Sequence, residues 1–237
     1  MFRVASYNMR KAIGTDRRRR PERTIEVLNE IGADVIALQE ADRRFGTRSA
    51  AIPLHLLEEH SDYRPIPLAA RANSMGWHGN ALLVKRDVEV TCCEPLHLPS
   101  LEPRGAVLAD LKVRGTALRV VGMHLDLSGL WRKRQLRAIL DAIECRPLKM
   151  PTVMMGDTNE WRTAAGCLND LGPDFHVAPT GASFHARHPV AQLDRIIVHK
   201  DLNIEAAGVH MSAEARRASD HLPIWARVSA TPSADGV

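Results

Sequence analysis

The hydrophobic pattern of the chain contains four short apolar runs that each end at a polar side chain. The runs are Val4 to Tyr7 before Asn8, Val35 to Gln39 before Glu40, Val120 to Met123 before His124, and Pro151 to Met155 before Gly156-Asp157-Thr158-Asn159. Short apolar runs that stop at polar or turn residues predict buried strands. Strand ends at one edge of a sheet converge in space. We therefore predict that Asn8, Glu40, His124 and Asp157 share one pocket, which is the active site.

Apolar residues at helical spacing predict the helices. Pro21 suits the first position of a helix, Ile25, Leu28 and Ile31 share one face, and Gly32 is the stop. Further helices are expected over residues 50–60, 129–145 and 164–170. The helix expected over 129–145 carries Arg132, Lys133, Arg134 and Arg137, which we interpret as a solvated face rather than a nucleic-acid contact.

A hairpin is the clearest local feature of the remaining pattern. Residues 106–113 and 116–123 read as strands joined by Arg114-Gly115. Other strands are expected over residues 80–85, 88–92, 192–198 and 222–228, and the last two lie beside Asp194 and Asp220-His221. A hairpin requires antiparallel pairing, so the pattern excludes a purely parallel doubly wound sheet.

Length and composition indicate an ordinary globular domain. The 237 residues are 45% hydrophobic and 25% charged, which excludes a disordered chain. We find no linker and no internal repeat, and we expect a single domain over residues 1–230 with a flexible polar tail over 231–237.

Charge and cysteine usage narrow the partners and the compartment. A formal charge of +4 suits an anionic substrate without requiring one. The four cysteines form no Cys-x-x-Cys pair, so we interpret them as reduced packing thiols of a cytoplasmic protein. We see no secretory signal, no apolar run of about 20 residues that could span a membrane, and no feature that demands an obligate protein partner.

Seven short motifs in a particular order carry a resemblance to a known family. They are Ser6-Tyr7-Asn8, Leu38-Gln39-Glu40, Glu102-Pro103-Arg104-Gly105, His124-Leu125-Asp126, Gly156-Asp157-Thr158-Asn159, Leu193-Asp194-Arg195-Ile196 and Ser219-Asp220-His221. In this order, over residues 2–229, the chain resembles the endonuclease/exonuclease/phosphatase superfamily, also called deoxyribonuclease I-like. The resemblance implies an α/β (α+β) four-layer sandwich, in which two mixed, mainly antiparallel sheets pack face to face with helices outside.

The resemblance also implies a metal-dependent hydrolase of phosphoesters. Glu40 and Asn8 would bind Mg²⁺ or Mn²⁺, and Asp220 would hold a second metal or help to position the first. The oxygen-rich set, with no cysteine partner, favours these hard cations over zinc.

The remaining motif residues would carry the chemistry. Asp157 would orient or deprotonate the attacking water, and Asn159 would donate hydrogen bonds to the phosphate. His221 and Asp194 would form a dyad that presents a positive imidazolium to the phosphate. His124 would protonate the leaving group, and Arg104 would bind a non-bridging oxygen with its charged fork.

Two positions depart from the family pattern. Thr158 stands where an aromatic or aliphatic residue is usual, which should be tolerated if its methyl group packs inward. The nuclease branch supports the residue matching His124 with a carboxylate, but residues 71–80 contain no acid. Asn80 or Asn73 would then be the partner of His124.

The substrate stays open between several classes. A nucleic acid is the first expectation, which makes the protein a phosphodiesterase or endonuclease. A phospholipid head group or a small phosphorylated metabolite is the alternative, and an inactive phosphate-binding module is the alternative outside enzymes. Short loops would select the substrate; they contain Lys11, Arg17 to Arg20, Arg43-Arg44, Trp77-His78, Trp131 and Trp161-Arg162. Trp131 could stack on a base, cover a lipid head group, or simply pack.

Overall fold

The computed structural model describes residues 1–43, 49–68, 73–100, 104–162 and 165–231. Its strands are β1 (Phe2–Asn8), β2 (Val35–Gln39), β3 (Tyr63–Pro65), β4 (Ala81–Lys85), β5 (Glu89–Leu96), β6 (Gly105–Val113), β7 (Thr116–His124), β8 (Thr152–Asp157), β9 (Phe175–Val177), β10 (Asp194–His199), β11 (Leu202–Val209) and β12 (Ile224–Ala230). Its helices are η1 (Arg10–Ala12), α1 (Pro21–Ile31), α2 (Leu54–His60), α3 (Gly129–Glu144), η2 (Gly166–Asp170) and α4 (Ala215–Ala218).

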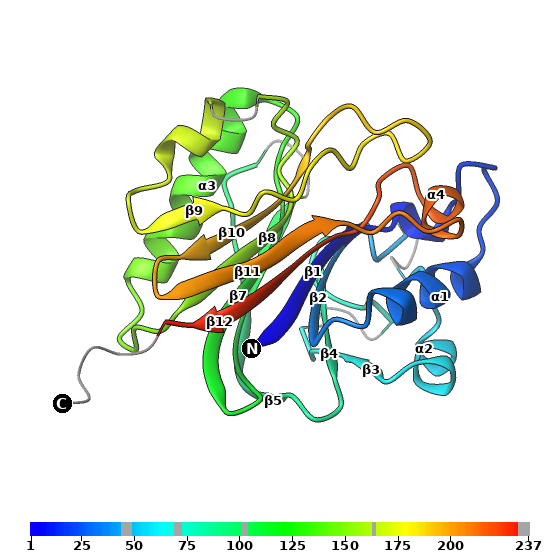
Figure 1. Ribbon diagram of the computed structural model, residues 1–237, viewed down its shortest axis with the longest axis horizontal. Coiled ribbons are helices and arrows are strands. Elements are labelled where there is room, and N and C mark those ends of the chain that lie inside the picture. The colour runs from blue at the N-terminus through cyan, green and yellow to red at the C-terminus, as the bar shows by residue number, and fades with distance from the viewer. Residues whose placement is uncertain (44–48, 69–72, 101–103, 163–164, 232–237) are drawn as a thin grey trace.

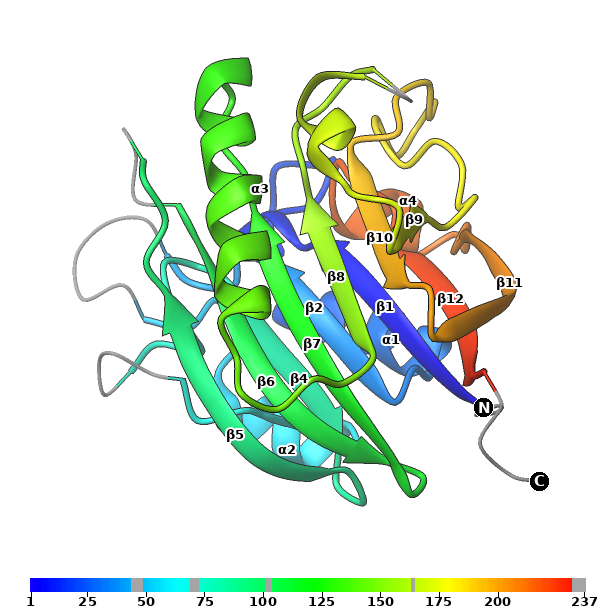
Figure 2. The same ribbon diagram turned by 90° about the vertical axis from the view of Figure 1, so that its left-hand side faces the viewer.

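The strands form two six-stranded sheets that pack face to face (Figures 1 and 2). One sheet has the order β11-β12-β1-β2-β4-β3, and the other has the order β5-β6-β7-β8-β10-β9. Among the strands that the structure describes, β1 with β2 and β7 with β8 pair in parallel, and the other neighbouring pairs are antiparallel. The predicted pair of mixed, mainly antiparallel sheets is confirmed.

Three apolar clusters hold four layers together. The cluster between the sheets joins residues such as Val4 and Val35 to Val120, Val153 and Ile196. A second cluster packs the outer face of the β1 sheet against α1, α2 and α4, and a third packs α3 and η2 against the outer face of the β7 sheet. Figure 2 shows α3 standing outside β7 and β8, on the side away from β1. Strand residues therefore alternate between two apolar surroundings, which is why β1, β2 and β8 are buried at every or nearly every position.

Local signals account for the elements that were predicted. Pro21 begins α1, and Gly32 ends it in the left-handed conformation with φ 60°. The β6–β7 hairpin turns through Arg114 and Gly115 at φ 49° and 82°, and Val113 pairs with Thr116. Two consecutive residues at positive φ match the twist of the flanking strands, so this turn closes the hairpin as expected.

Several boundaries differ from the prediction. The helix expected over 50–60 begins only at Leu54, because Pro53 disfavours helical geometry in the residue before it. The helix expected over 164–170 is the 3₁₀ helix η2. The strands expected over 192–198 and 222–228 begin two residues later, at Asp194 and Ile224. Strands β4 and β5 follow each other in the chain but belong to different sheets.

The hydrophobic pattern did not predict several short elements at the edges of the sheets. β3 and β9 have three residues each, α4 has four, and β11 is only half-buried along most of its length. Half-exposed edge strands need little apolar periodicity, so the hydrophobic pattern carries no clear signal for them.

Some predicted features lie outside the described residues. These are Arg44, Arg71, Glu102, Pro103, Ala164 and the tail beyond Thr231. Within the described part of the chain, no helix has both the length and the apolar character needed to cross a membrane.

The strand register brings the motif residues to one edge of the sandwich. Across β6, β7, β8 and β10, Gly105 pairs with His124, His124 with Asp157, and Asp157 with Asp194. In the facing sheet Asn8 pairs with Gln39, so Glu40 follows directly beyond that row. Since β1 also packs against β8, the two rows face each other across the inter-sheet core.

Candidate active site

Asp157 lies at the centre of the site. Asp157 is the last residue of β8, and this residue is 2% exposed. One carboxylate oxygen accepts a hydrogen bond from Asn8 Nδ2 at 2.9 Å, and the other accepts the backbone N–H of Asn159 at 2.9 Å. Gly156 is required just before it, because a Cβ at this position would overlap the Met123 carbonyl oxygen of β7. The close approach of β7 and β8 therefore delivers Asp157 to Asn8 of the opposite sheet.

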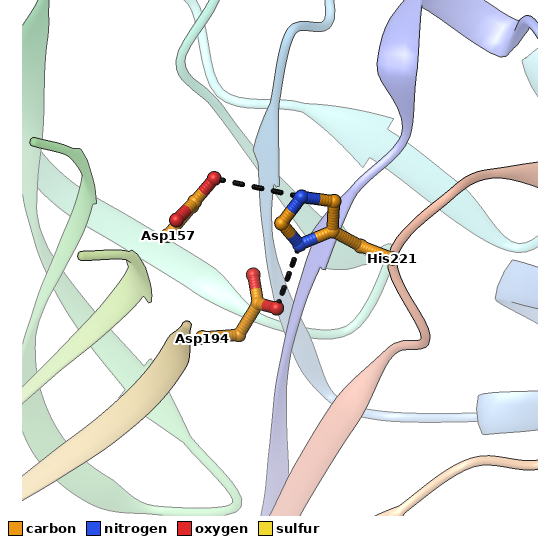
Figure 3. Close-up of side chains that lie close together, drawn as sticks. All are labelled: Asp157, Asp194 and His221. Carbon is orange, nitrogen blue, oxygen red and sulfur yellow. Dashed lines mark hydrogen bonds and ion pairs between the residues drawn. The ribbon is translucent and has the colours of Figure 1, made fainter. Parts of the chain in front are cut away.

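His221 and Asp194 form a buried ion pair beside Asp157. His221 Nδ1 lies 2.8 Å from Asp194 Oδ2, and its Nε2 lies 3.8 Å from Asp157 Oδ2. Figure 3 shows the imidazole between the two carboxylates, with one ring nitrogen directed at each. Ser183 Oγ donates a further hydrogen bond of 2.5 Å to Asp194. Sequence reasoning missed Ser183, because it lies in a loop outside every motif.

The carboxylates decide the protonation state of His221. Burial by itself lowers the pKa of this imidazole, but the charge and hydrogen bond of Asp194, with the charges of Asp157 and Asp220, outweigh burial and raise the pKa to about 10. His221 is consequently an imidazolium near neutral pH. Its positive charge at Nε2 is available to the space next to Asp157.

A tie to β1 fixes the loop that carries His221. Ser219 Oγ donates to the Asn8 carbonyl oxygen at 2.7 Å, and the His221 N–H is 3.3 Å from Ser219 Oγ. The ring of Phe184 covers the imidazole at a centroid distance of 4.9 Å. His221 is therefore held by contacts to its backbone N–H, to its ring nitrogen Nδ1 and to the face of its imidazole ring.

His124 has the opposite protonation state. Burial, the dominant cause, together with the guanidinium of Arg104 lowers the pKa of His124 to about 3, although Asp157 acts in the other direction. Arg104 Nη1 contacts His124 Nε2, which lies 3.5 Å from Asp157 Oδ2. Arginine has no acceptor, so Nε2 accepts this hydrogen bond and the neutral ring carries its proton on Nδ1. This arrangement favours a hydrogen-bonding role for His124 over protonation of a leaving group through Nε2.

The surroundings of Asn80, named above as a possible partner of His124, are also defined. Its Nδ2 donates to the Gly105 carbonyl oxygen at 3.0 Å, and the side chain joins β4 to the beginning of β6. Among the described residues, His124 instead contacts Arg104, which lies just before the neighbouring strand β6. This pairing depends on β6 and β7 being adjacent.

We predict that the pKa of His221 lies above that of an ordinary imidazole and that the pKa of His124 lies below it. In ¹⁵N-resolved NMR, His124 should stay neutral from pH 5 to 8 while His221 stays protonated, because their pKa values are about 3 and about 10. His176, on the exposed face of β9, serves as the internal comparison. A titration of His124 near pH 6.5 would contradict its described pairing with Arg104.

The Gly-Asp-x-Asn motif is held from both sides. Asn159 adopts φ 50°, and its Nδ2 donates to the Leu125 carbonyl oxygen at 2.9 Å. Thr158 is fully buried, and its hydroxyl donates to the Leu193 carbonyl oxygen at 2.8 Å. The departure at Thr158 is therefore accommodated by a hydrogen bond to the segment before β10. One amide hydrogen of Asn159 is left for a ligand, since the other is used by Leu125.

Glu40, Asn8 and Asp220 present oxygen atoms at the facing edge. Glu40 follows β2 at φ 53°, and its carboxylate forms an ion pair with Lys11. Asp220 Oδ2 lies 3.2 Å from Arg10 Nε, and Asn8 Oδ1 accepts the Arg10 N–H at 3.2 Å. Each of these oxygens thus already faces a positive group or a donor. Two carboxylates and one amide oxygen are the donor set that Mg²⁺ or Mn²⁺ prefers, so these residues fit the metal that the resemblance implies.

A second group of possible ligands suits a metal less well. Asp157, Asp194 and His221 offer ligand atoms within 4.8 Å of one another. Both ring nitrogens of His221 already face carboxylate oxygens, since Nδ1 lies 2.8 Å from Asp194 Oδ2 and Nε2 lies 3.8 Å from Asp157 Oδ2. We therefore interpret this group as a charged hydrogen-bonding network.

Residues of α3 and the neighbouring loop lie around this edge. Arg132, expected on a solvated face, is instead buried; its guanidinium donates to the Leu127 carbonyl oxygen at 2.6 Å and to Glu160 at 3.2 Å. That expectation was wrong for Arg132, because Glu160 supplies a buried counter-charge that the helix pattern cannot reveal. Trp131 is half-buried, and the guanidinium of Arg134 covers its ring at 5.0 Å.

Two packed sheets with this site at their edge make up the fold of a phosphoesterase family. The chain belongs to the Endonuclease/Exonuclease/phosphatase family, and the match to this family covers residues 5–221. The uncharacterized protein YbhP of Escherichia coli (strain K12) is 26% identical over 249 residues, with 96% of each chain covered.

Solved structures share the fold. A structure of D. rerio TDP2 complexed with single strand DNA product has a TM-score of 0.76 at 16% identity and covers 96% of this chain and 98% of its own. A mannosyl-6-phosphatase of Bacteroides thetaiotaomicron has a TM-score of 0.75 at 17% identity and covers 97% and 100%. At such identities the likeness concerns the fold alone.

Proposed function

We propose that the protein is a Mg²⁺- or Mn²⁺-dependent phosphodiesterase that directs water at phosphorus. The observation that carries this proposal is the position of Asp157, which lies within hydrogen-bond or ion-pair reach of Asn8, His124 and His221. A carboxylate between one protonated and one neutral histidine can take a proton from water while the positive charge of the protonated histidine faces the phosphate.

The residues around Asp157 divide the work. Asp157 orients the attacking water and accepts its proton as the new P–O bond forms. The P–O bond to the ester group then breaks, and the alcohol leaves as an oxyanion that takes its proton from solvent. His221 stays protonated because Asp194 stabilises its charge, and it binds a phosphate oxygen whose negative charge grows in the transition state. Asn159 and Arg104 donate further hydrogen bonds to the phosphate, as an amide and as a guanidinium that is always charged.

The metal would be held by Glu40, Asn8 and Asp220. When bound there, a divalent cation supplies Lewis-acid charge stabilisation of the phosphate oxygens. The oxygen donor set supports this assignment, as described above. The chain itself holds these three oxygens in place. One lies at the end of β1, one directly after β2, and one in the loop that contains Ser219.

A nucleic acid is the substrate that we propose first. The net charge of +4 suits a polyanion, and one fold relative is described in complex with a single-stranded DNA product. Trp161 offers an aromatic surface for the ester group of the substrate, because it is 63% exposed. Its ring lies edge-on, at 6.1 Å, to the ring of Phe184, which is the neighbour of His221. Trp131, partly exposed at the first turn of α3, is a second surface on which a base could stack.

Exposed aliphatic residues favour a second candidate substrate. Leu127 and Leu130 are 66% and 59% exposed just beyond the end of β7. Apolar side chains beside a phosphoesterase site suit a phospholipid head group or another apolar ester. A small phosphorylated metabolite belongs to the same alternative, since one fold relative is named a mannosyl-6-phosphatase.

A comparison of esters tests the function. We expect hydrolysis of an aryl phosphodiester with Mg²⁺ or Mn²⁺, weaker hydrolysis of the matching monoester, and none with EDTA. Single-stranded DNA and phospholipid vesicles are then compared at 50 and 200 mM salt, because binding to a nucleic-acid backbone weakens steeply with salt. Turnover that persists in EDTA would contradict metal dependence, and metal binding without any turnover would favour the phosphate-binding module.

We also infer a single domain and a cytoplasmic location. Strand β1 from the beginning of the chain lies between β2 and the late strand β12, which supports one domain over residues 1–230. Cys92, Cys93, Cys145 and Cys167 are all free thiols, which supports a reducing compartment.

A further inference from the structure

A left-handed turn follows β1 at the active edge. Arg10, Lys11 and Ala12 have φ values of 48°, 57° and 58°. Left-handed geometry is unfavourable for a residue with a side chain, so three such residues in succession are rare outside glycine. Such conformations persist only where surrounding contacts hold them, and they gather at functional sites.

The turn directs a positive or hydrogen-donating group at each proposed metal ligand. Lys11 Nζ forms an ion pair with Glu40 Oε2, Arg10 Nε lies 3.2 Å from Asp220 Oδ2, and the Arg10 N–H donates to Asn8 Oδ1 at 3.2 Å. Three groups from two consecutive residues therefore meet the three oxygens that would bind the cation. No such pattern is needed to complete the β1 strand, which ends at Asn8.

The backbone of the turn is anchored independently of the lysine side chain. The Lys11 N–H donates to the Glu40 carbonyl oxygen at 3.1 Å, and the Met9 N–H donates to the Gln39 carbonyl oxygen at 3.1 Å. The Lys11 side chain is 25% exposed, and the Glu40 side chain is 27% exposed. The ammonium group can thus leave Glu40 by rotation of its flexible stem while the turn stays in place.

We propose that Lys11 is a built-in competitor of the divalent cation for Glu40. This inference rests on the proposed metal site. The ammonium and a divalent cation cannot both approach the same carboxylate oxygen, because their like charges would repel at contact distance. Lys11 holds the Glu40 carboxylate in place when it binds there, and it lowers the affinity of the site for the metal. Arg10 acts in the same sense on Asp220, more weakly because its side chain is 36% exposed.

Isothermal titration calorimetry with Mn²⁺ and with Mg²⁺ tests the competition. Lys11→Met keeps the length of the stem and removes the charge, so we expect it to bind the metal about two- to fivefold more tightly than the wild type, as the loss of one partly exposed ion pair predicts. Lys200→Met is the matched control, because Lys200 pairs with Asp174 at 2.7 Å at the other end of β10. The control should bind as the wild type does, and Glu40→Gln should bind far more weakly.

Thermal unfolding gives a second readout. Without added metal, Lys11→Met should melt below the wild type, and added Mn²⁺ should raise its melting temperature by more. Arg10→Met should shift both quantities in the same direction by less, and it tests the idea if Lys11→Met fails to fold. Equal or weaker metal binding by both variants, with binding intact in the wild type, would overturn the competition alone. An absence of binding in the wild type and both variants would overturn the metal site and the competition with it.

Discussion

Asp157→Ala should reduce kcat by about 10³-fold or more, because it removes the group that accepts the proton from water. The substitution also removes the carboxylate that accepts from Asn8 and from the Asn159 N–H. It takes away the partner that lies 3.8 Å from His221 Nε2 and 3.5 Å from His124 Nε2. The measurement is steady-state hydrolysis of the aryl phosphodiester at saturating Mg²⁺.

Two further variants separate chemistry from folding. Asp157→Asn keeps the size of the side chain but presents an amide hydrogen to one of two existing donors, so it should stay nearly as inactive. Asp174→Ala, an exposed carboxylate paired with Lys200, should keep the wild-type rate. Circular dichroism shows whether each variant folds. Wild-type turnover by a folded Asp157→Ala protein would refute the proposed role of Asp157.

As far as His221 controls it, turnover should stay constant from about pH 7 to 9. It should fall as the pH rises past the pKa of His221, which is about 10. The charged imidazolium is the active form in the proposal, so activity is lost when the proton leaves. Asp194→Asn removes the leading cause that raises this pKa and should move the fall to lower pH, with a loss of about 10²-fold at pH 9. The pH profiles of kcat and kcat/KM measure both effects. An Asp194→Asn profile identical to that of the wild type would contradict the dyad.

The same two histidines should shape stability against pH. The pKa of folded His221 is raised above 6.5, so its contribution is complete below pH 6.5 and is lost as pH rises towards 10. The pKa of folded His124 is lowered from 6.5 to about 3, so its contribution is present above pH 6.5 and is lost as pH falls towards 3. With respect to this pair, the urea midpoint should be highest near pH 6.5, and His221→Gln should flatten the alkaline side.

Much of the fold could be predicted from local pattern. Gly32 and Pro21 bound α1, and the Arg114-Gly115 turn closes the β6–β7 hairpin. These features depend on residues within a few positions of one another, so their signals lie in short stretches of sequence. The pairing of β4 and β5 with separate sheets could not be predicted, because strand partners are chosen by long-range packing.

The candidate site was predictable in its members and not in its contacts. The motif order named Asp157, Asp194 and His221, which the structure brings into one network. The partner of His124 could not be found, since Arg104 lies 20 residues away and meets it only because β6 and β7 pair. Ser183 belongs to no motif, and the basic loop that contains Lys11 was predicted only as a substrate-selecting loop, without its contacts to Glu40 and Asp220.

The sequence by itself determined which side chains end the strands, because a strand ends where its apolar run meets a polar or turn residue. Only the tertiary structure decided their charges and neighbours. Asp157 lies 149 residues from Asn8, and Asp194 lies 27 residues from His221. A pKa depends on burial and on every nearby charge, whatever its place in the chain. Two histidines that look alike in the sequence therefore become one imidazolium and one neutral ring.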